Sequence, residues 1–152
     1  MRRYRRFIAV MLHLLGLVLA VPALAAPPHI VPELLIEGPA LPGGQITAAV
    51  LMRPETGWHG YWLNPGDAGL GLTLDWQLPL GASAGTLQYP TPGTLLLSGL
   101  MNHVYERDYA VLVELRLPME AVGTRLPIRA KAQWLACTDK ICVPESAEIA
   151  AT

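Results

Sequence analysis

A short run of the sequence, WLACTDKICVPE from Trp134 to Glu145, contains both cysteines of this 152-residue chain. The residues that lead into it, Ile128–Trp134, alternate between apolar and polar side chains, as in a strand with one buried face. Residues 138–140 are Thr-Asp-Lys, which suit a tight turn. We therefore expect a hairpin with Cys137 at the end of one arm and Cys142 at the start of the other.

Such a hairpin permits a local disulfide. Residues that face each other in an antiparallel pair have Cα atoms about 4.5–5.5 Å apart, and a disulfide needs about 4.4–6.8 Å. Closing so short a loop stabilises a fold by only about 2 kcal/mol. A working redox pair needs an accessible thiolate and a second cysteine that resolves the mixed disulfide. The residue pattern alone leaves both a structural staple and a redox pair open.

The residues around the cysteines leave their chemistry undecided. Lys140 favours a thiolate and Asp139 opposes it. The two thiols together with Met101 and His103 also allow a third interpretation, a site for a soft ion such as Cu(I). The spacing of four residues matches neither the thioredoxin Cys-x-x-Cys motif nor the haem-attachment motif Cys-x-x-Cys-His.

The N-terminus predicts export. Residues 1–6 carry four arginines, Phe7–Val21 is almost entirely apolar, and Ala23-Leu24-Ala25 is a small-x-small cleavage signal. We interpret residues 1–25 as a secretory signal peptide, because the apolar run is shorter than the roughly 20 residues that span a bilayer. Residues 26–152 then form one domain in an oxidising compartment, where disulfides persist.

Composition favours an all-β domain. Fourteen prolines and fourteen glycines are scattered along the chain, and short alternating segments such as Leu72–Leu78, Tyr109–Leu117 and Leu126–Ala136 indicate half-buried strands. Without the signal peptide the formal charge is about −5, and no basic patch with aromatics indicates nucleic-acid binding. We predict seven to nine short strands in an immunoglobulin-like β-sandwich, and a monomer.

Several segments carry specific local predictions. Glu33–Glu37 is expected as an edge strand and Gln45–Arg53 as a strand. The Asn-Pro-Gly-Asp sequence of residues 64–67 predicts a turn. Thr91–Met101 is predicted to be a long irregular loop, and Pro118–Thr124 to hold a single helical turn.

Three motifs together resemble one protein family. They are Gly57-Trp58-His59-x-Tyr61-Trp62-x-Asn64-Pro65-Gly66-Asp67, then Tyr105-Glu106, then Trp134-Leu135-x-Cys137…Cys142-x-Pro144-Glu145. In order and spacing this set is similar to the N-terminal periplasmic domain of the thiol:disulfide interchange protein DsbD family, and most of all to its branch that includes the copper-tolerance protein ScsB. The likeness covers most of the mature chain, and the family domain is an immunoglobulin-like sandwich.

The resemblance implies a periplasmic electron relay, a protein-disulfide reductase module. A membrane electron-transfer domain of a DsbD/ScsB-type reductase would reduce the Cys137/Cys142 pair. The pair would then reduce thioredoxin-like partners, including disulfide isomerases and cytochrome c maturation proteins. We expect Cys137 to attack the partner, Cys142 to be its disulfide mate, and no small-molecule cofactor. The 152 residues hold neither the membrane domain nor the thioredoxin-like domain of that family, so we expect a stand-alone domain or one part of a longer protein.

The resemblance also implies neighbours for the pair. Tyr61 falls where the family has an aromatic beside the cysteines. A cap loop that shields them would correspond to about Leu96–His103, which includes Met101. The short cysteine spacing and the lack of the family's aromatic-and-acid cap sequence are departures from the better-known members.

The remaining notable residues are expected to be structural. The four tryptophans suit a sandwich core, and His59 and His103 are expected as surface or core histidines rather than catalytic bases. No Ser/His/Asp arrangement, paired-carboxylate motif or phosphate loop is indicated. Two rivals to the relay stay open: a periplasmic adaptor whose disulfide only pins a hairpin, and a copper-handling protein.

Overall fold

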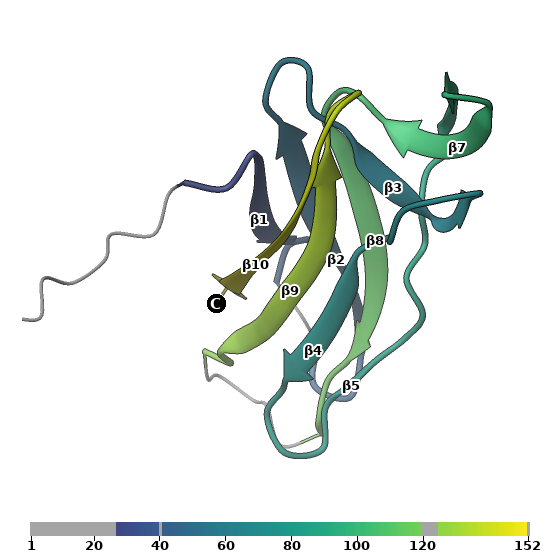
Figure 1. Cartoon of the computed structure of the whole chain (residues 1–152). Coiled ribbons are helices and arrows are strands. Elements are labelled where there is room, and N and C mark those ends of the chain that lie inside the picture. The colour runs from purple at the N-terminus through teal and green to yellow at the C-terminus, as the bar shows by residue number, and fades with distance from the viewer. Residues whose placement is uncertain (1–26, 40, 120–124, 152) are drawn as a thin grey trace, which may run out of the picture.

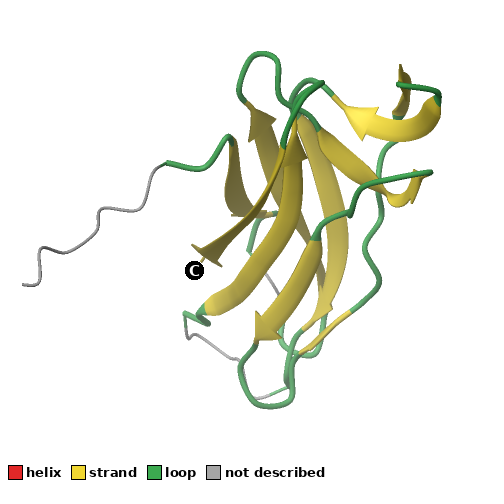
Figure 2. Ribbon diagram, viewed as in Figure 1, coloured by secondary structure: helices red, strands yellow, loops and turns green. Residues whose placement is uncertain are grey.

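The computed structural model describes residues 27–39, 41–119 and 125–151. All regular structure in these ranges is strand, with no helix (Figure 2). Its strands are β1 (Ile30–Ile36), β2 (Gln45–Pro54), β3 (Gly60–Gly66), β4 (Thr73–Gln77), β5 (Ser83–Ala84), β6 (Gly93–Leu97), β7 (Leu100–Tyr105), β8 (Tyr109–Arg116), β9 (Ile128–Cys137) and β10 (Cys142–Ala151). No helix that could cross a membrane occurs among the residues described. The predicted signal peptide lies outside these ranges, as does most of the predicted helical turn at 118–124.

Two antiparallel sheets form a sandwich, and a third lies at one end. The first has the order β1-β2-β8-β5, the second β10-β9-β4, and the third β3-β7-β6. Figure 1 shows β9 and β4 in front of β2 and β8, with β7 and β3 to one side, near the end where β9 meets β10. The predicted all-β sandwich is confirmed, with more strands than the seven to nine expected.

The core lies between the first two sheets. It is built by alternation, because successive side chains of a strand point to opposite faces. On β9 every second residue from Ile128 to Ala136 is buried while Arg129, Lys131 and Gln133 are exposed, as predicted. Val111 and Val113 of β8 are fully buried on the facing sheet. Complete burial of one such apolar side chain contributes about 1.5–3 kcal/mol.

The third sheet corrects the prediction for Thr91–Met101. The segment predicted to be an irregular loop is a hairpin of β6 and β7, in which Leu97 pairs with Leu100. Ser98 and Gly99 connect the strands with φ of +51° and +86°, the left-handed conformation of a two-residue hairpin turn. The region that the resemblance predicted to be a cap loop is therefore strand structure; we refer to β6 and β7 as the cap hairpin.

The predicted turn at residues 64–67 is also wrong. β3 continues through Asn64 and Pro65 to Gly66, which pairs with Asn102 of β7 after a register irregularity. Asp67 extends the connection, because its N–H donates to the Met101 carbonyl at 2.8 Å and its carboxylate accepts the Met101 N–H at 2.7 Å. These bonds hold the end of β3 against β7, and the chain bends only after Gly66, at Asp67 and Ala68.

The start of β3 is packed closely against the sandwich. A Cβ on Gly60 would lie 2.5 Å from the Tyr109 hydroxyl oxygen, so only glycine fits there without displacement. The Tyr109 ring stacks on Tyr105 with centroids 4.1 Å apart, and the Tyr105 hydroxyl donates to the Pro90 carbonyl at 2.6 Å. These contacts hold the start of β3 against β7 and β8, and His59, just before β3, forms a bridge with Cys137 at the end of β9.

Candidate functional site

The two cysteines face each other where β9 ends and β10 begins. They are register partners, with Cα atoms 4.1 Å apart, and are joined by a disulfide. The turn between them is closed by Thr138, whose N–H donates to the Ile141 carbonyl at 2.8 Å. The Thr138 hydroxyl accepts the N–H groups of Lys140 and Ile141, both at 3.1 Å. The predicted hairpin, with one cysteine on each arm, is confirmed.

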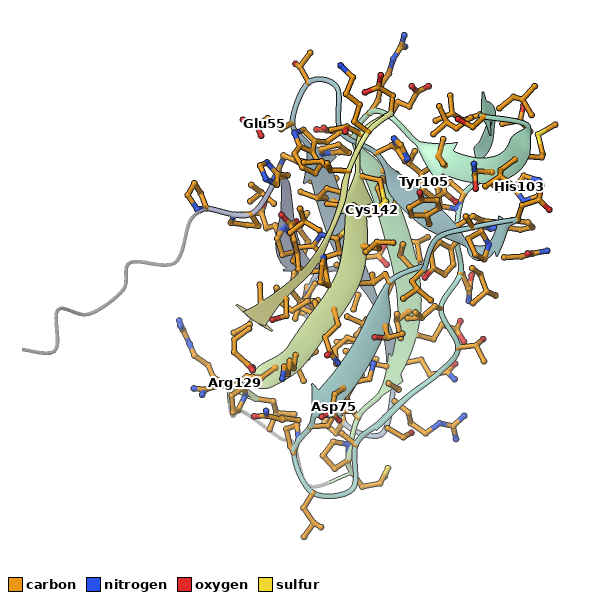
Figure 3. All side chains as sticks on the ribbon, in the orientation of Figure 1. Glu55, Asp75, His103, Tyr105, Arg129 and Cys142 are labelled. Carbon is orange, nitrogen blue, oxygen red and sulfur yellow. A yellow bond between two sulfur atoms is a disulfide. The ribbon has the colours of Figure 1, made fainter. Side chains whose placement is uncertain are left out.

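The two sulfur-bearing residues differ in exposure. Cys137 is only 1% exposed, whereas Cys142, at the edge of its sheet, is exposed to solvent. Figure 3 shows Cys142 at the end of the β9–β10 hairpin. A thiolate from another protein can therefore reach the disulfide only from the Cys142 side. This burial argues against the prediction that Cys137 attacks the partner, because that role requires an accessible sulfur.

His59 extends the cysteine pair into a row of three residues. It forms an antiparallel bridge with Cys137, in which the His59 N–H donates to the Cys137 carbonyl at 2.8 Å and the Cys137 N–H donates to the His59 carbonyl at 3.1 Å. Residues directly opposite in an antiparallel pair project from the same face. The side chains of His59, Cys137 and Cys142 therefore lie side by side on one face, and that of His59 is buried.

Tyr61 and the cap hairpin cover Cys137. Tyr61, Val104 of β7 and Cys137 form a small buried cluster, against which Leu95 of β6 and Leu135 of β9 pack. Tyr61 is only 4% exposed. The structure therefore places Tyr61 next to the cysteine pair and covers the buried sulfur with apolar groups from both strands of the cap hairpin.

Two polar side chains, those of His59 and Tyr61, lie next to each other among these apolar residues. The Nε2 atom of His59 lies 3.3 Å from the Tyr61 hydroxyl oxygen. Burial lowers the pKa of His59, and the negative charge of Glu106 opposes that change to a smaller extent. Burial also raises the pKa of Tyr61. Both side chains are therefore uncharged near neutral pH, and the site holds a neutral imidazole beside a neutral phenol.

Met101 and His103 lie on the other side of the cap hairpin. Each is an odd number of residues from Val104 along β7, so its side chain is on the opposite face of the strand and points away from the cluster around Cys137. Nδ1 of His103 donates to the Asn64 carbonyl at 3.0 Å, and its ring meets Trp62 edge-on at 5.5 Å. Figure 3 shows His103 well apart from Cys142. Across the described ranges no group of three His, Cys, Asp or Glu side chains is placed to hold a metal ion.

Glu145 anchors the disulfide hairpin to the first strand. Its carboxylate accepts the backbone N–H of His29 at 2.6 Å and of Ile30 at 3.2 Å, as well as the indole N–H of Trp134 at 2.8 Å. Trp134 and Glu145 are also cross-strand partners in the β9–β10 ladder. One carboxylate thus joins β1, β9 and β10 three residues beyond Cys142. The sequence singled out Glu145 as part of a motif but gave no indication of its partner strand.

Replacement of Glu145 should destabilise the whole fold. Glu145→Ala leaves three N–H groups without their acceptor, and hydrogen bonds to a charged group contribute about 1.5–3 kcal/mol each. Because Glu145 is half-buried, water can replace part of these bonds, and we expect a loss of at least about 3 kcal/mol in the free energy of unfolding, measured by urea denaturation of the oxidised protein. Glu148→Ala, at an exposed position of the same strand, is the matched control and should change stability by less than about 0.5 kcal/mol. Equal effects of the two changes would contradict this role.

An apolar groove of about 470 Å³ includes Pro144, two residues beyond the exposed cysteine, in its lining. Leu63 and Leu70 line it on one side, and Trp134 and Pro144 on the other. Pro144 projects from the same side of β10 as Cys142 because the two are separated by one residue. Ile141, in the turn next to Cys142, is 56% exposed. The exposed residues close to the reachable sulfur are thus both apolar, Ile141 and Pro144, and charged, Asp139 and Lys140, the mixture that protein-binding surfaces generally show.

Comparison with solved structures finds the same fold in other proteins. The fold is similar to the crystal structure of the N-terminal periplasmic domain of ScsB from Proteus mirabilis, at a TM-score of 0.62 and 17% identity over 84% of this chain and 48% of that one. It is also similar to the reduced N-terminal domain of Neisseria meningitidis DsbD, at a TM-score of 0.52 and 19% identity over 84% of this chain and 89% of that one. This chain thus spans about half of the ScsB structure. No curated protein matches it.

The family itself is shown by a match of sequence. The family model described as "Thiol:disulfide interchange protein DsbD, N-terminal" matches residues 31–152, which include every strand except the first residue of β1, the cap hairpin and both cysteines. The resemblance inferred from the three motifs is therefore confirmed, and its class of chemistry, thiol–disulfide exchange, agrees with a disulfide that has one reachable sulfur. The chain belongs to the family of DsbD N-terminal domains.

Proposed function

We propose that this protein relays electrons by thiol–disulfide exchange through Cys137 and Cys142. The observation that carries the proposal is the unequal exposure of the two cysteines: Cys142 is open to solvent and Cys137 is 1% exposed. An exchange protein needs one sulfur that a partner can reach and a second one close by that resolves the mixed disulfide. A staple has no need of an exposed sulfur.

The reaction begins with the reduced pair. The Cys142 thiolate attacks a disulfide of the partner, so a bond forms between Cys142 and one partner sulfur while the other partner sulfur leaves as a thiolate. The Cys137 thiolate then attacks the Cys142 sulfur and displaces the bound partner sulfur. Two electrons have passed to the partner, which is now a dithiol, and the Cys137–Cys142 disulfide is restored. Reduction by a donor dithiol runs through the same steps in reverse, with the donor attacking Cys142.

Family membership supports a proposal for the donor and the acceptor. We assign the donor role to the membrane electron-transfer domain of a DsbD/ScsB-type reductase and the acceptor role to periplasmic thioredoxin-like proteins, including those of cytochrome c maturation. The predicted signal peptide and the periplasmic location named for the ScsB relative support export to the periplasm. The disulfide itself is the redox group, so the reaction as proposed requires no small-molecule cofactor.

The cap hairpin has a protective role in this proposal. Leu95 and Val104 cover Cys137, so oxidants in solution cannot reach that sulfur. A partner can approach Cys142 along the exposed edge of β10 without displacing the core of the sandwich. Shielding one sulfur and presenting the other confines exchange to partners that fit the surface around Cys142.

The reduction potential of the cysteine pair tests the proposal. It is measured by equilibrating the purified protein with glutathione or dithiothreitol buffers and counting free thiols at each ratio. A potential of roughly −120 to −270 mV, the range of exchange proteins, is the expected result. A potential below about −300 mV would identify a structural disulfide and would favour the adaptor alternative.

A further inference from the structure

Reaction of the buried cysteine involves a proton that needs an acceptor. Cys137 is only 1% exposed and is covered by Tyr61, Val104 and Leu95. A thiol in apolar surroundings keeps its proton, yet only the thiolate attacks a disulfide. Water has little access to this sulfur, so the group that accepts its proton has to be part of the protein.

The row of side chains described above supplies one candidate. His59 is directly opposite Cys137 in a bridge held by two backbone hydrogen bonds. Side chains of such pairs have Cβ atoms about 4.5–5.5 Å apart on the same face, within reach of an imidazole. Cys137 thus lies between its redox mate Cys142 on one side and His59 on the other.

Other groups near His59 support the assignment. On its own strand, the Tyr61 hydroxyl lies 3.3 Å from Nε2 and fixes the orientation of the ring. On β7, His103 and Tyr105 are bonded elsewhere, to the carbonyls of Asn64 and Pro90. Glu106, just beyond β7, is the charged group whose effect reaches the imidazole, and it opposes the stronger effect of burial. An uncharged imidazole near neutral pH is free to accept a proton.

We propose that His59 accepts the proton of the Cys137 thiol when the internal disulfide closes. This inference rests on the proposed exchange function. The S–H proton moves to the imidazole, and the Cys137 sulfur attacks the Cys142 sulfur of the mixed disulfide. The Cys137–Cys142 bond forms, the bond from Cys142 to the partner breaks, and the partner sulfur leaves as a thiolate. The imidazolium then returns the proton to that thiolate or to solvent. During reduction by a donor, the imidazolium protonates Cys137 as it leaves.

The assignment predicts that one step of exchange depends on His59 and the other does not. Reduced protein is mixed with oxidised glutathione, quenched with acid at intervals, and analysed by mass spectrometry for the mixed and the internal disulfide. In His59→Gln the mixed disulfide should form at the wild-type rate, because it uses Cys142. Its closure should slow by about 10-fold or more, a conservative value for loss of a general base, so the mixed disulfide should accumulate. His103→Gln, the same change on β7 away from the pair, is the matched control and should behave as wild type.

The pH profile separates a proton acceptor from a structural residue. Wild-type closure should level off above the His59 pKa, whereas closure in His59→Gln should rise in proportion to hydroxide concentration. Closure in the variant with the wild-type rate and profile would overturn the assignment. Failure of the wild-type protein itself to form any mixed disulfide would instead refute the exchange function.

A measurement on the wild-type protein covers the case in which the variant does not fold. The His59 ring resonances are followed by NMR against pH in the disulfide and the reduced forms. In the reduced form they should report two coupled titrations, that of the imidazole and that of the Cys137 thiol. In the disulfide form they should report only one. Identical curves for the two forms would show that the imidazole does not sense the thiol, and would overturn the assignment.

Discussion

A Cys142→Ser variant should lose thiol–disulfide exchange with protein partners entirely. Cys142 carries the sulfur that another protein can reach, and Cys137, at 1% exposure, cannot replace it. We expect the rate of reduction of a thioredoxin-like substrate to fall to the rate without protein, and no mixed disulfide to form. The measurement is a coupled assay with the reduced variant, together with non-reducing gel analysis of the products.

The reciprocal variant is the control. Cys137→Ser keeps the exposed thiol and removes the resolving one, so it should attack the partner and then stop. A stable mixed disulfide through Cys142 should accumulate in place of turnover. If Cys137→Ser were inert and Cys142→Ser formed the trapped complex, the roles would be reversed, as the sequence had suggested, and the cap hairpin would have to open before the partner binds.

A Gly69→Ala change should destabilise the protein. It should also disturb the cysteine pair indirectly, through Tyr61. Gly69 has φ of +106°, and a Cβ there would lie 2.2 Å from the ring of Tyr61. The backbone conformation costs about 1–3 kcal/mol for a residue with a side chain, and overpacking adds about 1–3 kcal/mol. We expect a loss of about 2–6 kcal/mol in the free energy of unfolding, measured by urea denaturation. Because Tyr61 packs on Cys137, the disulfide should also become easier to reduce.

Gly57→Ala is the control that separates the cost of the backbone conformation from the cost of overpacking. Gly57 also has a positive φ, of +86°, but a Cβ there would meet nothing within 4 Å. This variant should lose about 1–3 kcal/mol in the free energy of unfolding, the cost of the backbone conformation alone, and the reduction potential of the cysteine pair should stay unchanged. Equal stability losses and equal potentials for the two variants would show that Tyr61 does not transmit the change to the disulfide.

Strands with a strict alternation could be predicted from the sequence. Leu72–Leu78 and Tyr109–Leu117 alternate because one face of each strand is buried, and both are strands in the structure. The cap hairpin could not be recognised in this way. Its run Leu95-Leu96-Leu97 is apolar throughout, so the sequence shows no alternation of apolar and polar residues. In the structure Leu95 packs on the cluster around Cys137, whereas Leu96, on the other face of the strand, is apolar but 64% exposed. The signal that could have revealed it is Ser98-Gly99, a dipeptide suited to a two-residue hairpin turn.

The candidate site was only partly accessible from the sequence. The hairpin could be predicted from local spacing, since Cys137 and Cys142 are close in the chain, and its geometry permitted the disulfide that the structure contains. The unequal exposure of the sulfurs depends on the edge position of β10 and on packing by distant strands, which a local pattern does not contain. His59 was expected to be a core or surface residue, and it is buried. Its pairing with Cys137 joins segments 78 positions apart, so only the folded structure could reveal it.

The ladder between β9 and β10 sets the effective molarity of the two thiols. Backbone pairing extends from Cys137–Cys142 to Ile128–Ala151, and the bond from Trp134 to Glu145 crosses it close to the sulfurs. None of these contacts depends on the sulfur–sulfur bond, so the thiols stay opposed after reduction. Reoxidation is then an intramolecular reaction between prepositioned groups. The pairing of the strands thus favours the disulfide and makes the dithiol form a stronger reductant. Changes that loosen the ladder should make the protein a weaker reductant even when both cysteines are intact.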